Sequence, residues 1–204
     1  MIVCNTSEEL FREIRNRYDA SLKKVFPVLI GGCSRVGKST LSQKILTNCT
    51  EEGIEASIVA LDSWLISVDK RKPVSTVLER YEMDACNKAI EKLLEGETIV
   101  PPFYDPVSRK RIAEMSGSPV KISSGILIIE GVIALSDPGL QSKKGVSVFA
   151  SVPDLTRLKR LLDFYGRIKN IPRSAYRQII MDREKEEVPF ITKSAQFADI
   201  LYKG

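Results

Sequence analysis

The sequence predicts an α/β fold in which helices cover both faces of a parallel sheet. Short apolar runs typical of buried strands, at residues 25–30, 126–129 and 146–152, alternate along the chain with segments whose apolar residues recur every three or four positions. Glycines and other turn residues bound these runs, and the first run ends in a glycine turn that opens a helix. This alternation indicates strands joined by helical crossovers.

Two capping patterns mark expected helix starts. Thr6 with Glu9 and Thr76 with Glu79 each place a glutamate three positions after a threonine, which predicts helices over residues 6–22 and 76–94. The other elements that the pattern predicts are strands at residues 54–61 and 198–202 and helices at 41–46, 154–163 and 173–185.

The alternation of strand and helix breaks over residues 101–124. Asp105-Pro106, Gly117 and Ser118-Pro119 divide this stretch into short segments that are too brief for helices. We therefore expect a β-hairpin inserted between two strands of the main sheet.

The composition is that of an ordinary folded protein, because 43% of the 204 residues are hydrophobic and 28% are charged. We expect one domain spanning residues 1–204. No apolar run approaches the ~20 residues that cross a bilayer, and the first ten residues lack a secretory signal pattern, so a cytoplasmic protein without a membrane partner is expected. The net charge of +5 favours anionic partners without naming one.

Cysteine and histidine usage narrows the possible chemistry. The 4 cysteines show no CxxC spacing and the chain contains 0 histidines, so neither a zinc site nor a disulfide framework is expected. Nucleophilic triads that use histidine are excluded. Acid–base chemistry therefore falls to carboxylates, lysine or water.

A phosphate-binding loop is the clearest motif. Residues 32–39 match GxxxxGK[ST], after a strand and at the start of a helix. In such a loop backbone N–H groups and the positive end of the helix dipole surround phosphates, the lysine neutralises them and the final hydroxyl binds Mg²⁺. The residues predicted to bind a nucleotide are Gly32, Cys33, Ser34, Arg35, Val36, Gly37, Lys38, Ser39 and Thr40. The alternative is a purely structural glycine turn.

Other features of the sequence narrow the class of nucleotide-binding protein to which this loop could belong. The sequence has no NKxD motif for reading guanine, and it is short for an oligomeric ATPase with a sensor domain. A kinase for small molecules or for nucleic acid is what remains. ATP and Mg²⁺ are the expected cofactors.

Two carboxylates follow predicted strands. Asp62 comes after the strand at 54–61 and Glu130 after the strand at 126–129, so both are expected at the carboxyl edge of the sheet, beside the phosphate-binding loop. Phosphoryl transfer needs one carboxylate to orient and deprotonate the acceptor hydroxyl and another to hold Mg²⁺. Asp62 and Glu130 suit these roles. The alternatives are a helix cap for Asp62 and a loop acid for Glu130.

Several motifs, taken in order, resemble the uridine kinase and phosphoribulokinase family over residues 24–203. They are Gly31-Gly32 through Thr40, Asp62-Ser63-Trp64, Tyr104-Asp105, Ile129-Glu130-Gly131, the basic helix from Arg157 to Arg160, and Lys193 with Ala198-Asp199-Ile200. The resemblance implies a P-loop kinase domain with an N-terminal helix at 1–23, a hairpin at 101–124, and a helical lid with its following helix at 154–187. It implies transfer of the γ-phosphate of ATP to a hydroxyl.

The same resemblance implies roles for individual residues. Asp62 would be the base, Ser39 and Glu130 would serve Mg²⁺, and Lys38 would balance the phosphate charge. Arg157 and Arg160 would close over the phosphates, with Arg167 as a further candidate. Tyr104 belongs to the acceptor side, and Glu82 stands where uridine kinases place an acid that grips the ribose.

Departures from the family bear on the acceptor. Leu65 replaces an aromatic residue, Arg109 a histidine and Pro106 a ring-stacking phenylalanine, so uridine is not the expected acceptor. Arg109, Lys110 and Arg111 are suited to an anionic one, such as a sugar phosphate, a nucleotide or a nucleic-acid end. The alternatives are a solvated hairpin, a kinase for a nucleic-acid hydroxyl, and an ATP-binding regulator without catalysis.

Two features of the lid region are expected to be structural. Residues 184–187 have the composition of a solvated helix end. Four leucines are expected to form the packing face of the first lid helix: Leu155, Leu158, Leu161 and Leu162.

Overall fold

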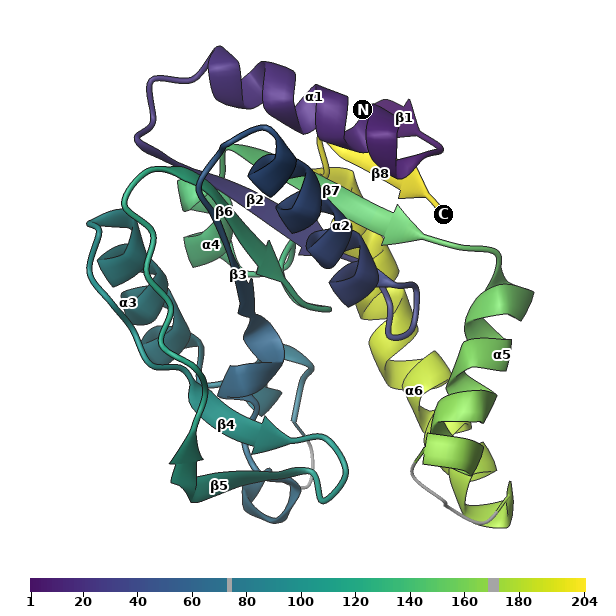
Figure 1. The fold of residues 1–204 in the computed structure, drawn as a ribbon. Coiled ribbons are helices and arrows are strands. Elements are labelled where there is room, and N and C mark those ends of the chain that lie inside the picture. Colours follow the sequence, from purple (N-terminus) through teal and green to yellow (C-terminus); the bar gives the residue numbers. More distant parts are fainter. Residues whose placement is uncertain (73–74, 169–172) are drawn as a thin grey trace.

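The computed structural model describes residues 1–72, 75–168 and 173–204. Within them six strands form one parallel sheet, in the order β1-β8-β7-β2-β6-β3, and a separate antiparallel pair is formed by β4 and β5 (Figure 1). The predicted α/β class is confirmed. The strands of the main sheet are β1 (Ile2–Cys4), β2 (Val25–Gly31), β3 (Ala56–Ala60), β6 (Gly125–Glu130), β7 (Val146–Ser151) and β8 (Ile200–Lys203).

The centre of the sheet is apolar on both faces. Every residue of β2 and β6 is buried, which explains why these strands are continuous apolar runs rather than alternating ones. In the register of the sheet Glu130 stands opposite Ile30 of β2 and Ala60 of β3. The carboxyl ends of these three strands therefore meet at one edge.

Helices cover the sheet, with α1 and α2 in front of it and α4 behind it in Figure 1. Helices α1 to α6 span Ser7–Asp19, Lys38–Glu51, Met83–Leu94, Pro138–Lys143, Asp154–Asp163 and Arg173–Lys193. None of the helices in the described part of the chain has the length and apolarity of a membrane span.

The N-terminal segment follows the prediction with two differences. The capping box of Thr6 and Glu9 is formed, with the Glu9 N–H donating to Thr6 Oγ1 over 3.1 Å. The helix ends at Asp19 instead of residue 22, since the N–H groups of Ala20 and Ser21 close its last turn and Leu22 is exposed. Strand β1 was not predicted, because its three residues gain their structure from pairing with β8.

The helix predicted over residues 76–94 begins seven residues late, at Met83. Thr76 and Glu79 do form a capping box, but it caps a 3₁₀ turn, Leu78–Arg80. Tyr81 then pairs with Leu65 in an antiparallel bridge, and the Glu82 N–H donates to the Trp64 carbonyl. These backbone contacts hold the chain extended there, so tertiary pairing overrides the local helix signal.

The hairpin insertion is confirmed. Strands β4 (Pro102–Asp105) and β5 (Lys110–Ser116) pair antiparallel. Asp105 organises the turn between them, because its carboxylate accepts hydrogen bonds from the Val107 and Ser108 N–H groups at 2.9 Å. Arg109 leaves this turn with φ of 59°, in the left-handed region.

Helices α5 and α6 form a hairpin that faces β4 and β5 across the molecule (Figure 1). Helix α5 matches the prediction, whereas α6 continues eight residues further, to Lys193. Leu161 packs with Tyr165 and Ile180 in a small core of their own. The other leucines predicted to pack, Leu155, Leu158 and Leu162, are exposed, because α6 covers only one narrow face of α5.

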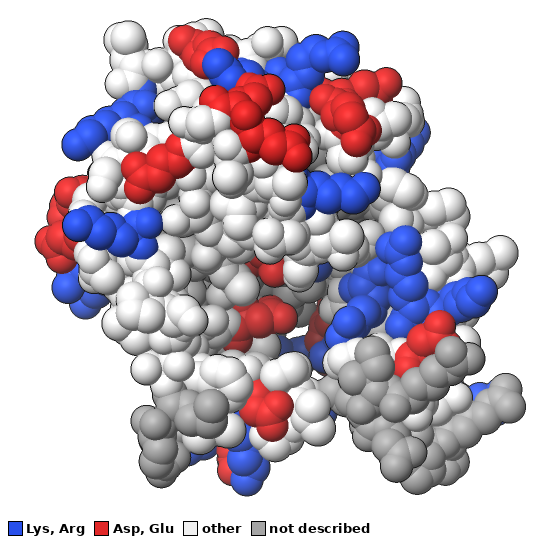
Figure 2. Space-filling model, viewed as in Figure 1, with Lys and Arg blue, Asp and Glu red and all other residues white. Residues whose placement is uncertain are grey.

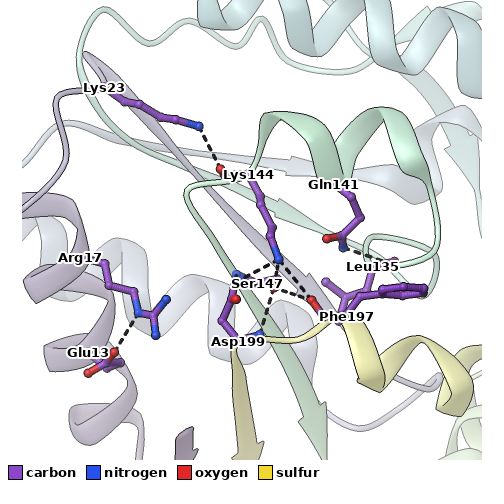
Figure 3. A network of polar contacts seen from close by, with 9 residues as sticks. All are labelled: Glu13, Arg17, Lys23, Leu135, Gln141, Lys144, Ser147, Phe197 and Asp199. Carbon is purple, nitrogen blue, oxygen red and sulfur yellow. Dashed lines mark hydrogen bonds and ion pairs between the residues drawn. The ribbon is translucent and has the colours of Figure 1, made fainter. Parts of the chain in front are cut away.

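A polar network fastens β8 to β7 at the end of the sheet remote from the phosphate-binding loop (Figure 3). The Asp199 carboxylate accepts from the Ser147 hydroxyl over 2.7 Å and from the Ser147 N–H over 2.9 Å. The Lys144 ammonium lies 3.2 Å from the same carboxylate. Asp199 belongs to the family-like motif near the end of the chain, and its contacts in the structure serve to hold β7 and β8 together.

Candidate active site

The phosphate-binding loop joins the end of β2 to the start of α2. Gly32 has a φ of 135°, and a Cβ there would lie 2.3 Å from the Ala150 carbonyl oxygen, so a side chain cannot be accommodated. Gly37 caps α2 with a φ of 103°, and Arg35 also has a positive φ, of 67°. The chain therefore turns back on itself and presents the N-terminus of α2 to the edge of the sheet, as the motif predicts.

Lys38 is buried beneath this loop. Its ammonium donates to the carbonyls of Gly32 at 3.0 Å and Cys33 at 3.1 Å. Burial lowers the pKa of Lys38, and the carboxylates of Glu130 and Asp62 act in the opposite direction. The ammonium is thus centred among the loop and both predicted carboxylates.

Ser39 and Glu130 meet on the floor of the site. The serine hydroxyl donates to Glu130 Oε1 over 2.9 Å, which joins the first turn of α2 to the end of β6. Burial raises the pKa of Glu130, while Lys38 and the Ser39 hydrogen bond lower it. A hydroxyl and a carboxylate are hard oxygen donors, and their pairing beside the loop fits the Mg²⁺ site that the sequence predicts.

Asp62 extends from a 3₁₀ turn, Leu61–Trp64, directly after β3. Ala60 is the capping residue of this turn, and the Asp62 carboxylate instead lines the cleft. It accepts a hydrogen bond of 3.3 Å from the hydroxyl of Tyr81. Trp64, at the other end of the same turn, is buried in the core.

These groups open into a cleft of about 750 Å³. Figure 2 shows it as a hollow between the two arms of the molecule, with acidic atoms inside and basic side chains gathered on the side of α5. The lining includes residues 34–41, Asp62, Arg71, Tyr81, Tyr104, Pro106, Arg109, Glu130, Arg160, Tyr165 and Arg183. The phosphate-binding loop, the β4–β5 hairpin and the α5–α6 hairpin therefore border one space.

Of the residues predicted to contact the acceptor, some line the cleft and others do not. Tyr104 and Arg109 line the cleft. Glu82 and Arg111 bind each other, with Arg111 Nη1 2.6 Å from Glu82 Oε2, and neither belongs to the described lining. Lys110 pairs with Asp69 on the surface, at 3.1 Å. The cluster of three hairpin cations that the sequence suggested is thus reduced to Arg109.

Arg71 takes a place in the cleft that the sequence did not predict. Its Nη2 donates to the Tyr104 hydroxyl over 3.2 Å, and its Nε donates to the Ile66 carbonyl over 2.9 Å. Among the described residues, Arg71 forms no ion pair with a carboxylate. Arg71 belongs to none of the motifs recognised in the sequence, so nothing in the sequence indicated that it lines the cleft.

The arginines predicted to belong to the lid differ in whether their side chains reach the cleft. Arg160 lines the cleft and donates through Nη1 to the carbonyl of Val36, over 3.1 Å. Arg157 is buried instead, bound to both oxygens of Glu184 at 2.7 Å and 2.6 Å, and lies outside the described lining. The side chain of Arg167 lies outside the described residues. Of the predicted arginines with a described side chain, the structure brings only Arg160 to the loop.

Residues 184–187 are not a solvated helix end. Glu184 holds Arg157, while Glu186 and Glu187 both bind Arg80, each at 2.8 Å. Arg183, one turn before Glu187, lies in the cleft with its Nε 3.8 Å from that glutamate. Packing of α6 against α5 and the 3₁₀ turn at Arg80 produces these pairs, which the composition of the segment alone did not indicate.

A phosphate-binding loop that shares a sheet edge with two carboxylates, below a helical arm carrying an arginine, defines a P-loop nucleotide-binding protein of the kinase type. Comparison with known proteins agrees. The chain is 29% identical to a uridine kinase of Leuconostoc citreum over 154 residues, which cover 69% of the chain and 71% of that protein. It is 29% identical to a uridine kinase of Vibrio parahaemolyticus over 186 residues, 84% of each.

The fold has a close parallel among solved structures. A candidate fructose transport system kinase of Silicibacter sp. superposes with a TM-score of 0.78 at 20% identity, over 97% of this chain and 99% of that one. No family model matches the sequence. The sequence similarities support a uridine-kinase-like P-loop kinase family for the chain.

Proposed function

We propose that the protein is an ATP-dependent phosphotransferase that moves the γ-phosphate to a hydroxyl of a small molecule other than uridine. One observation carries the proposal: the Asp62 carboxylate lines the same cleft as the phosphate-binding loop. A carboxylate at that place can orient an acceptor hydroxyl toward the terminal phosphate and accept its proton. The likeness to uridine kinases supports the reaction class.

The other residues of the cleft supply charge and position. Lys38 and the backbone of the loop would hold the phosphates, since the ammonium and the N-terminus of α2 lie together. Arg160 contacts the loop from α5, so approach of this helix brings positive charge to the transferring group and excludes water. Ser39 and Glu130 would hold Mg²⁺, which when bound neutralises charge on the phosphate oxygens.

An anionic acceptor, such as a sugar phosphate, fits the acceptor side best. Arg71, Arg109 and Tyr104 line that side of the cleft, and Arg71 donates to the Tyr104 hydroxyl. Neither arginine has an ion-pair partner in the described part of the chain. Arginine forms paired hydrogen bonds with phosphate and carboxylate groups. Glu82, the predicted ribose ligand, is bound to Arg111, which weakens the case for a nucleoside.

The test is ADP release from purified protein with ATP, or GTP in its place, and Mg²⁺, across sugars, sugar phosphates, nucleosides including uridine, and oligonucleotides. We expect turnover with a phosphorylated sugar or a similar small anion. Turnover confined to uridine would contradict the acceptor assignment. Turnover confined to oligonucleotides, with steep salt dependence, would identify a nucleic-acid kinase. Binding of ATP in calorimetry without turnover of any acceptor would identify a nucleotide-binding regulator.

A further inference from the structure

We propose that Tyr81 is a positioning residue that fixes the orientation of the Asp62 carboxylate, so that this carboxylate can accept the proton of the acceptor hydroxyl as the hydroxyl attacks the γ-phosphate. This inference rests on the proposed function, in which Asp62 is the base. Its starting observation is the 3.3 Å hydrogen bond from the Tyr81 hydroxyl to Asp62 Oδ1. No motif of the sequence pointed to Tyr81.

The tyrosine is itself held in place. Its side chain is 7% exposed and belongs to the main hydrophobic core. Its backbone pairs with Leu65, and its N–H donates to the Leu78 carbonyl over 3.0 Å. The bridge between Leu65 and Tyr81 fastens the segment that carries the tyrosine to the 3₁₀ turn that carries Asp62. The two side chains therefore share one rigid frame.

The hydroxyl is a donor in this contact. Burial raises the pKa of Tyr81 well above its ordinary value, and the nearby charges of Asp62 and Glu187 raise it further. The phenol thus keeps its proton, and the carboxylate oxygen accepts. Arg183 and Lys38 also lie within electrostatic range of Asp62, but Tyr81 is its hydrogen-bond donor among the described side chains.

Fixing one carboxylate oxygen has a consequence for the other. The exposed Asp62 side chain could otherwise turn about its last bond, and only some orientations would face an acceptor. With Oδ1 held by Tyr81, Oδ2 is left to accept the hydroxyl proton. A positioned base reacts faster than a mobile one because orientation is set before the reaction.

Positioning differs from direct contact with the acceptor in its kinetic effect. If Tyr81 acts through Asp62, loss of its hydroxyl lowers kcat and leaves the acceptor KM and the ATP dissociation constant unchanged. If the hydroxyl bound the acceptor, KM would rise instead. The substitution Tyr81→Phe keeps the buried ring and removes only the oxygen, so the core packing is preserved.

The experiment compares wild type, Tyr81→Phe and a control, Tyr18→Phe. Tyr18 is a partly buried tyrosine that packs edge-to-face on Phe26 at 6.0 Å, away from the cleft. We expect kcat of Tyr81→Phe to fall about tenfold, the scale of one hydrogen bond to a charged group, with KM and ATP binding within about twofold. Tyr18→Phe should match wild type. An unchanged kcat, or a raised KM with kcat preserved, would overturn the proposal.

A structural readout separates this inference from the proposed function. In crystal structures of wild type and Tyr81→Phe, we expect one ordered conformer of Asp62 in the former and alternative conformers in the latter. The same single conformer in both would overturn the positioning role. Asp62→Asn with normal turnover would instead refute Asp62 as the base, whatever the conformers show.

Discussion

Arg111 of β5 and Glu82 at the start of α3, two residues that the sequence assigned to acceptor binding, are bound to each other at 2.6 Å. Arg111 also donates to the Leu65 carbonyl, so it links the hairpin to the segment that follows Asp62. The pair stabilises the wall of the cleft and takes no part in its lining. Under the proposed function, recognition of the acceptor therefore falls to cleft side chains without an ion-pair partner in the described part of the chain, such as Arg109.

Arg109→Ala should raise the acceptor KM about tenfold and leave ATP binding unchanged, because it removes one paired, charge-assisted contact to an anion. Steady-state kinetics with the acceptor identified by ADP release, and calorimetry with ATP, measure the two effects. Lys110→Ala is the matched control, since it removes one positive charge from the same hairpin outside the cleft. Equal acceptor KM values for the two variants would show that Arg109 does not contact the acceptor.

Asp62→Asn should preserve ATP binding and lower turnover by about two to four orders of magnitude, because the amide cannot accept the hydroxyl proton. Single-turnover assays and calorimetry separate chemistry from binding. Asp69→Asn serves as the control, since Asp69 is an exposed aspartate paired with Lys110. Retained turnover in Asp62→Asn would place the base elsewhere.

Glu130→Gln should raise the Mg²⁺ concentration needed for half-maximal turnover, because a neutral amide is a weaker ligand for a hard cation than a carboxylate. The readout is a Mg²⁺ titration of ADP release at saturating ATP and acceptor. Glu91→Gln, on the outer face of α3 where Glu91 pairs with Lys143, should leave the titration unchanged. An unshifted midpoint in Glu130→Gln would exclude Glu130 from metal binding.

The parts of the site that the sequence predicted are those set by local geometry. The phosphate-binding loop depends on glycines at fixed spacing, and Asp62 and Glu130 depend only on where β3 and β6 end. Once the strands are parallel, their carboxyl ends must share an edge. The loop and both carboxylates were therefore within reach of sequence analysis.

The parts that were missed are set by contacts between distant segments. Arg71 and Arg183 reach the cleft because the chain folds around it, not because of their neighbours in sequence. Arg157 matched the lid pattern, yet it turns toward Glu184 of the opposite helix. Thr76 shows the same effect on secondary structure. Its capping box is formed, but it caps only a 3₁₀ turn, because the pairing of Tyr81 with Leu65 keeps the next residues extended.

Asp199→Ala should lower the free energy of unfolding by about 2 kcal/mol, because Ser147 and Lys144 lose their shared acceptor. Urea unfolding at neutral pH measures this loss. Asp19→Ala, which removes an exposed partner of Arg15, should cost about 0.5 kcal/mol or less. A loss no larger than that of Asp19→Ala would show that the network contributes little to stability.

The contribution of Asp199 should also depend on pH. Burial acts to raise its pKa, but the hydrogen bonds from Ser147 and the charge of Lys144 outweigh burial, so the pKa is lowered. The stabilisation is therefore complete above the ordinary aspartate value of 3.8 and is lost as the pH falls through the lower folded value. The difference in unfolding free energy between wild type and Asp199→Ala should shrink below about pH 4. A difference that stays constant as the pH is lowered well below 4 would contradict the assignment.

The four cysteines should react slowly in the native protein, although one of them lies in the phosphate-binding loop. Cys4, Cys33, Cys49 and Cys86 are all buried and free. Burial raises the pKa of each thiol, to about 11 for Cys49 and about 12 for Cys86, and in Cys33 burial outweighs the opposing charges of Arg157 and Lys38. Since the thiolate is the nucleophile, both access and ionisation oppose attack.

Titration with a disulfide reagent at pH 8 tests this expectation. In the native protein the thiols should react with the reagent only as fast as local unfolding exposes them. In guanidinium all 4 thiols should react at once. Lys88→Cys places an exposed thiol on α3 and should add one fast equivalent, which shows that the reagent is active under native conditions. A fast equivalent in the unmodified chain, lost in Cys33→Ala, would mean that the phosphate-binding loop opens readily and exposes a reactive thiol.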